Sequence, residues 1–224
     1  VPAVSDSEET RKAEIIGQAY FLRAFFYHQL YSLYGRIPLV DHTFDIDSDW
    51  VETRADMDDV ADFIVKDCES AIEKLPLKYE SSDDFGRATR GAAMAVKART
   101  LLYKASPLFG EPSTEKWQEA AKASKDIIDL GVYSLPTVSS SEEYAALFYN
   151  TQNPEIIFEK LYNNKGTYGS ALHYLFQSPN GPYNGYNGWG VWLPTYDIVN
   201  AFQNEDGSKY TVKGLASYNI SLPS

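Results

Sequence analysis

Residues 13–35, AEIIGQAYFLRAFFYHQLYSLYG, carry apolar side chains at the spacing of an α-helix. One series of apolar residues recurs at steps of three or four positions, and its members are Ile15, Ile16, Ala19, Leu22, Phe26, Leu30 and Leu33. Tyrosine and phenylalanine fill the other faces, a pattern typical of a helix that packs on several sides. Gly35 can form a left-handed cap and Pro38 cannot continue a helix, so the sequence predicts one helix over residues 6–34.

Five further helices are predicted in the same way, at about 57–75, 90–106, 115–130, 141–149 and 195–204. Asp56, Thr89 and either Ser113 or Thr114 stand where N-cap side chains are expected. Cys68 falls within the apolar stripe of the helix at 57–75, so we expect an inert core thiol. Residues 155–159, EIIFE, are typical of a short strand.

The helices contain a faint internal repeat. AYFLRAFFY at 19–27 shares its alanine, arginine and tyrosine positions with AVKARTLLY at 95–103, an offset of 76 positions (95 − 19). This offset is about twice the period of roughly 34–38 residues that stacked helix pairs show. We therefore predict a mainly α fold of tetratricopeptide-like stacked helical hairpins, in which Arg23 and Arg99 pair with carboxylates or helix-end carbonyls between repeats.

The composition excludes several classes of protein. The 224 residues contain no run of about 18 apolar residues, which argues against a membrane-spanning helix. The single cysteine excludes an intrachain disulfide and a cysteine zinc cage. The net charge of −11 makes nucleic acid or an anionic lipid surface a poor partner. All of the acidic excess lies in the first 84 residues. This acidic region is either a solvated surface or a face that meets a basic partner.

Sequence motifs for catalysis are absent. The sequence has no G-x-S-x-G, Walker, G-x-G-x-x-G or H-E-x-x-H motif. Asp45-x-Asp47-x-Asp49 resembles the start of an EF-hand loop, but Trp50 stands where that loop needs glycine. We therefore expect no enzyme activity, no cofactor and no metal, although a carboxylate pair of a glycoside hydrolase can escape sequence inspection.

Aromatic residues crowd the stretch 162–196, which holds nine aromatics, five asparagines and six of the fourteen glycines. Rigid rings with polar edges offer a large contact area, and the apolar C–H face of a sugar suits such a platform. Asparagines between the rings can bind the sugar hydroxyls. The predicted ligand-binding residues are Tyr183, Asn184, Tyr186, Asn187, Trp189 and Trp192. The alternative is that these rings only pin a long loop onto the helical part.

Four segments, in the same order, resemble the SusD/RagB family. They are residues 19–27 with LYGRIPLV at 33–40, GRATRGAA at 86–93 continuing through 97–109, EIIFE at 155–159, and 194–207. Members of this family are non-catalytic, lipid-anchored proteins on the extracellular face of the outer membrane in Bacteroidetes. They bind glycans, or peptides in some branches, and cover a SusC-like TonB-dependent transporter.

The resemblance implies a helical part over residues 1–150 and a loop-rich, minor-β ligand-binding part over 151–224, within one domain truncated at both ends. It also implies capture of an oligosaccharide for import, with contact to the membrane only through a lipid anchor that this chain lacks. The chain starts at Val1 without a signal peptide or lipid-attachment cysteine, so we expect a processed, engineered or partial chain. A peptide-binding member, a glycoside hydrolase and a helical-repeat interaction module stay open as alternatives.

Overall fold

A computed structural model of the chain describes residues 6–47, 51–148, 150, 153–161 and 195–209. Its contacts divide the chain into two units, Val1–Lys160 and Leu161–Ser224, which are described separately below. The first unit contains helices α1 (Asp6–Tyr34), α2 (Met57–Lys74), α3 (Arg90–Ala105), α4 (Thr114–Asp129) and α5 (Ser141–Leu147), and the short 3₁₀ helix η1 (Ser82–Asp84). The second contains α7 (Tyr196–Ala201).

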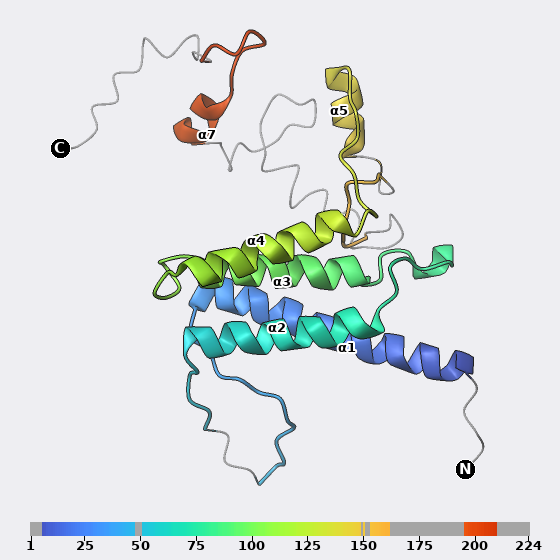
Figure 1. Cartoon of the computed structure of the whole chain (residues 1–224), viewed down its shortest axis with the longest axis vertical. Helices are drawn as coiled ribbons and strands as arrows, with labels where there is room; N and C mark the ends of the chain where they lie inside the picture. The colour runs from blue at the N-terminus through green and yellow to red at the C-terminus, as the bar shows by residue number, and fades with distance from the viewer. Residues whose placement is uncertain (1–5, 48–50, 149, 151–152, 162–194, 210–224) are drawn as a thin grey trace, which may run out of the picture. The chain divides into compact units, whose positions relative to one another are not determined.

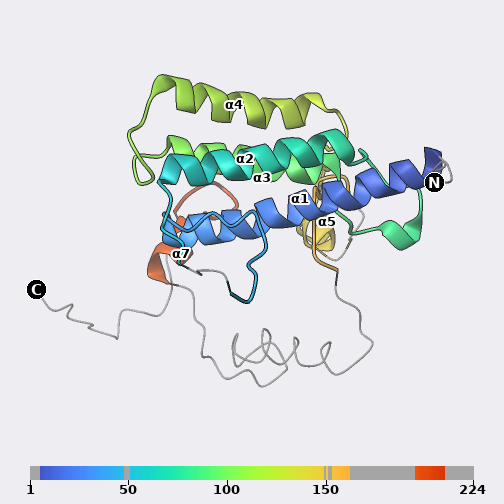
Figure 2. The same ribbon diagram turned by 90° about the horizontal axis from the view of Figure 1, so that it is seen from below.

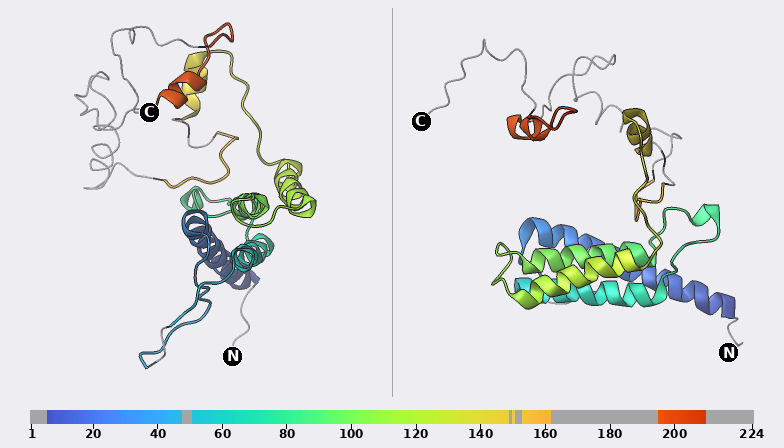
Figure 3. Two further views of the ribbon diagram at one scale, coloured as in Figure 1. Left: turned by 90° about the vertical axis from the view of Figure 1, so that its left-hand side faces the viewer. Right: turned by 45° about the horizontal axis from the view of Figure 1, so that its top comes forward.

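Helices α1 to α4 form two stacked antiparallel hairpins (Figures 1 and 2). Helix α1 packs against α2, α2 packs against α3, and α3 packs against α4. The left view of Figure 3, along the helices, shows the α1–α2 pair in one layer and the α3–α4 pair in the next. This arrangement confirms the mainly α fold of tetratricopeptide-like hairpins, and each of the four helices ends within one residue of its predicted bounds.

The core uses a different face of α1 from the apolar series noted in the sequence. Its buried residues are Gly17, Phe21, Ala24, His28 and Tyr31. Phe21 is 1% exposed, whereas Phe26 is 60% and Leu33 is 75% exposed. Within the described residues, α1 therefore does not bury its aromatic side chains on all sides, because α2 and α3 cover only one face of it.

The helix ends follow local hydrogen bonding. The Thr89 hydroxyl accepts from the Ala92 N–H at 3.3 Å, and the Ser113 hydroxyl accepts from the Lys116 N–H at 3.2 Å, so both predicted caps are confirmed. Asp56 occupies the N-cap position of α2 without a side-chain cap bond, because its carboxylate lies 2.6 Å from Arg36 Nη2 instead. Gly35 ends α1 at φ +65°, and its N–H donates to the Tyr31 carbonyl at 2.9 Å.

Cys68 lies in the core between the hairpins, as its place in the apolar stripe predicts. Burial, helped by the neighbouring Asp67, raises the pKa of its thiol to about 12. The thiol therefore stays protonated and inert at neutral pH.

The strand predicted at residues 155–159 is wrong. This segment continues a turn at Pro154 and Glu155 and bends at Ile157 without regular secondary structure, and no strand ladder occurs among the described residues. Within the segment, the Ile156 N–H donates to the Asn153 carbonyl at 3.2 Å, and just before it the Pro154 carbonyl accepts from the Ser134 N–H at 3.1 Å. Because the described residues provide no second strand beside it, the segment has no ladder to join among them.

In the second unit, α7 is shorter than the predicted helix at 195–204. Gly207, at φ +77°, forms a turn in which the Asn204 N–H donates to the Ser208 carbonyl at 2.8 Å. This turn pairs Gln203 with Lys209 in an isolated antiparallel bridge and so draws the chain out of the helix.

Candidate functional site

The six predicted ligand-binding residues lie outside the described part of the chain. They are Tyr183, Asn184, Tyr186, Asn187, Trp189 and Trp192. Their role therefore stays a prediction from the sequence. Asp49 and Trp50, from the segment that resembles the start of an EF-hand loop, also lie outside the described residues.

The first unit has a groove of about 430 Å³ at the end of the bundle where α2 and α4 end and α3 begins. We call it the bundle-end groove. It is lined by residues 77–81, 84–87 and Thr89, by Val132 and Tyr133, and by Asn153, Pro154 and residues 156–159. Its aromatic side chains are Tyr79, Phe85, Tyr133 and Phe158.

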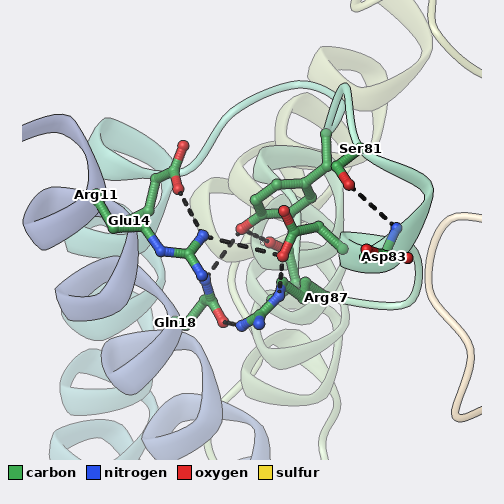
Figure 4. A network of polar contacts seen from close by, with 9 residues as sticks. Arg11, Glu14, Gln18, Ser81, Asp83 and Arg87 are labelled. Atoms are coloured by element: carbon green, nitrogen blue, oxygen red, sulfur yellow. Dashed lines mark hydrogen bonds and ion pairs between the residues drawn. The ribbon is translucent and has the colours of Figure 1, made fainter. Parts of the chain in front are cut away.

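A polar network fixes one edge of this groove to the first turns of α1 (Figure 4). The Asp84 carboxylate lies 2.5 Å from Arg87 Nε and 3.9 Å from Arg11 Nη1. Arg87 Nη1 also donates to Gln18 Oε1 at 3.1 Å. The network thus holds the Asp84 carboxylate and the Arg87 guanidinium in fixed positions beside the groove.

Tyr79 joins the same network. Its hydroxyl donates to the Ala88 carbonyl at 3.1 Å and accepts from Gln18 Nε2 at 3.2 Å. Burial raises the pKa of this phenol, so it stays protonated. Two hydrogen bonds of the hydroxyl therefore hold the ring in place.

Tyr133 reaches the groove because the second residue of α3, Gly91, has no side chain. A Cβ atom added at Gly91 would lie only 2.6 Å from Tyr133 Cε2, and closer still to the hydroxyl. The absent side chain lets the ring lie directly on the first turn of α3. The Tyr133 and Thr89 hydroxyls are 3.5 Å apart.

Two aromatic residues of α1, Phe21 and Phe25, position the Phe158 ring. This ring meets Phe21 edge-on with the ring centres 5.0 Å apart, and Phe25 at 6.2 Å. The next residue, Glu159, also lines the groove. Its Oε1 atom is shielded from solvent and accepts no hydrogen bond within the described part of the chain.

No pattern in the sequence indicated a ligand site at this groove. Its residues come from three connections that have no helical or strand periodicity, so no local pattern links them. Residues 86–89 and 155–159 stand out in the sequence through the family resemblance, the N-cap at Thr89 and the predicted strand, none of which indicates a ligand site. The contact of Phe158 with Phe21 and Phe25 arises only when the chain folds.

Comparison with known proteins identifies the family. A family model of SusD-like proteins, described as starch-binding and associating with the outer membrane, matches residues 3–102. A solved SusD-like protein from Bacteroides fragilis is 32% identical with a TM-score of 0.73, and the match covers 91% of this chain. The chain belongs to the SusD/RagB family.

Other SusD-like structures share the fold. A SusD-like carbohydrate binding protein from Bacteroides fragilis is 24% identical, with a TM-score of 0.68 over 95% of this chain. A laminarin binding SusD-like protein is 24% identical, with a TM-score of 0.58, and the match covers 74% of this chain and 33% of that protein. No curated protein matches the sequence.

This SusD-like chain spans only part of its relatives' length. It covers 38% of the first Bacteroides fragilis protein and 37% of the second. Across the part of the chain that the structure describes, no helix is long and apolar enough to cross a membrane. Nor do the described residues bring together three side chains able to hold a metal ion.

Proposed function

We propose that this chain is part of a SusD-like surface protein that binds an oligosaccharide and passes it to a SusC-like TonB-dependent transporter, without catalysis. The observation that carries the proposal is the match of residues 3–102 to a family described as starch-binding and associating with the outer membrane. Two relatives support it, because one is a SusD-like carbohydrate binding protein and the other is a laminarin binding SusD-like protein. In the full-length protein, a lipid anchor would hold it on the extracellular face of the outer membrane.

The proposed ligand platform is the aromatic segment at 183–192. Trp189 and Trp192 supply the flat faces on which sugar rings stack, and Tyr183 and Tyr186 extend them. Asn184 and Asn187 supply amide groups for the sugar hydroxyls. A neutral sugar on such a platform needs no opposite charge, so binding should persist at high salt.

A glycan array followed by isothermal titration calorimetry tests this proposal. Trp189→Ala and Trp192→Ala should each weaken binding of the best array ligand by about 1–3 kcal/mol, the scale of losing an aromatic anchor. Their helical circular dichroism should match that of the wild type. Trp117→Ala, on the exposed side of α4, removes the same ring elsewhere and should leave affinity unchanged.

Other outcomes would contradict the proposal. Full affinity in both variants would remove the segment from the site, and lowered melting without lost affinity would mean that the rings only pin the loop. Binding of peptides but no glycans would favour the peptide-binding branch of the family. Analysis of the bound sugar after long incubation should recover intact oligosaccharide, since cleavage would indicate an enzyme.

A further inference from the structure

We propose that the bundle-end groove is a second ligand site, which binds one pyranose unit of a neutral oligosaccharide. The ligand class rests on the proposed function, whereas the site rests on the described residues of the first unit. Its volume of about 430 Å³ falls within the range of small-molecule sites, about 300–1,000 Å³.

The apolar part of the groove suits a sugar ring. Tyr79, Phe85, Tyr133 and Phe158 come from three separate connections and line one concave site. Phe85 and Phe158 are exposed there, and exposed aromatic rings gathered in a groove favour a partner that covers them. The C–H face of a pyranose supplies such a cover without a charge.

The polar part of the groove supplies fixed hydrogen-bonding groups. Asp84 can accept from one sugar hydroxyl and Arg87 can donate to the next, and both are already held by Arg11 and Gln18. Side chains fixed before binding lose little conformational entropy when the ligand arrives. This pairing of an acceptor and a donor matches the two roles that sugar hydroxyls play.

Glu159 gives a second, independent reason to expect a ligand. Its Oε1 atom is buried and receives no hydrogen bond in the described part of the chain, which is costly for a carboxylate oxygen. A hydroxyl donor that enters the groove and displaces the atoms covering Oε1 would satisfy it. Among the described residues, this acceptor is thus left for a sugar hydroxyl to pair.

The charges of the groove favour a neutral sugar over an acidic one. The charged side chains that line it are Lys78, Glu80, Asp84, Arg87 and Glu159. Three of these five are acidic, and Arg87 is already paired with Asp84. An anionic sugar would therefore meet two further carboxylates, those of Glu80 and Glu159. Lys78 is the one cation of this lining outside the Asp84–Arg87 pair, so it alone would offset their repulsion.

Methyl NMR of the chain locates the site directly. The probes are maltoheptaose and laminarihexaose as neutral sugars, a trigalacturonate as an anionic sugar, and a neutral heptapeptide. The reporters are the ¹³C-labelled methyl groups of Ile156 and Ile157, which line the groove, assigned through isoleucine-to-valine variants. A neutral sugar should shift both signals in a saturable way, and the trigalacturonate should bind at least about tenfold more weakly.

Two groove variants separate binding from folding. Phe85→Ala should lower the sugar affinity measured from the Ile156 and Ile157 signals by about tenfold. Glu159→Leu should lower this affinity similarly while the melting temperature stays level or rises, because it removes a buried oxygen that has no hydrogen-bond partner among the described residues. Leu135→Ala, an exposed control outside the groove, should change neither.

The double variant Trp189→Ala/Trp192→Ala distinguishes this site from the proposed function. Groove signals that still shift in the double variant support an independent site. Sugar binding that depends on the tryptophans, with silent groove signals, would overturn this inference and keep the proposed function. No sugar binding at all would overturn both, and equal shifts with the peptide or the anionic sugar would overturn the assignment to a neutral sugar.

Discussion

Arg23 of α1 and Asp67 of α2 form a two-pronged ion pair across the first hairpin. Arg23 Nε donates to Asp67 Oδ2 at 2.6 Å and Nη2 donates to Oδ1 at 2.8 Å. The Asp67 side chain is 3% exposed, whereas that of Arg23 is 34% exposed. The guanidinium also lies 4.8 Å from the centre of the Phe63 ring. The pair therefore joins a buried carboxylate to a guanidinium that still reaches solvent.

Removing the arginine should destabilise the protein more than removing the acid. Arg23→Met leaves the buried Asp67 carboxylate unpaired and should lower the free energy of unfolding by about 3 kcal/mol. Asp67→Asn leaves a partly solvated guanidinium and should cost less. Urea denaturation measures both variants against Lys122→Met, which breaks the exposed pair with Asp126 and should change stability by less than about 1 kcal/mol. A loss for Arg23→Met no larger than for Lys122→Met would contradict the role of this pair.

The two faces of α1 should respond differently to truncation. Phe21→Ala empties a core position and should cost about 3–5 kcal/mol of unfolding free energy. Phe26→Ala removes a largely exposed ring and should cost less than about 1 kcal/mol. Thermal and urea unfolding of the two variants measures the difference. Similar losses in both would mean that the Phe26 face is also packed in solution.

His28 should make the fold less stable in acid. It is buried, and its Nδ1 lies 3.0 Å from the Thr100 hydroxyl, whose proton goes to the Val96 carbonyl at 2.8 Å. Nδ1 is therefore the donor. Burial, and to a lesser extent Arg99, lowers the pKa of His28 below its ordinary value of 6.5. The unfolded chain thus takes up the proton first, so the stability that is present above pH 6.5 is lost as the pH falls below it.

The measurement is the melting temperature as a function of pH for His28→Gln, which keeps an N–H donor but cannot titrate. The variant should lack the part of the acid-induced loss that begins below pH 6.5. His42→Gln, in an exposed position, serves as the control and should retain that loss. Identical pH profiles for the wild type and His28→Gln would contradict the prediction.

Gly91 should tolerate no side chain while Tyr133 is present. Alanine ordinarily favours a helix over glycine by about 1 kcal/mol, but at this position its Cβ would collide with the Tyr133 ring. Gly91→Ala should therefore lower the melting temperature and displace Tyr133 from the groove. In a double-mutant cycle, adding Gly91→Ala to Tyr133→Ala should be neutral or stabilising, and an additive loss would show that the ring is not the obstacle.

The sequence alone determined the helical scaffold of this protein. The ends of α1 to α4 depend on nearby residues, such as the glycine at position 35 and the caps at Thr89 and Ser113, so a local pattern is enough to find them. The family also follows from local segments, because four of them resemble SusD/RagB segments and occur in the same order along the chain. The predicted pairing of Arg23 with a carboxylate is confirmed, but Asp67 lies in the same hairpin and not in the next repeat. Arg99 lies exposed on α3 and takes part in none of the described ion pairs.

Only the tertiary structure decided which side of α1 enters the core and where the groove forms. Helix α1 carries apolar residues on nearly every face, so its periodicity cannot tell Phe21 from Phe26, and the position of α2 and α3 makes the choice. The bundle-end groove joins residues 77–89, 132–133 and 153–159, which are far apart in the sequence. The ends of α2 and α4 and the start of α3 bring them together, because antiparallel packing places these three ends at one side of the bundle.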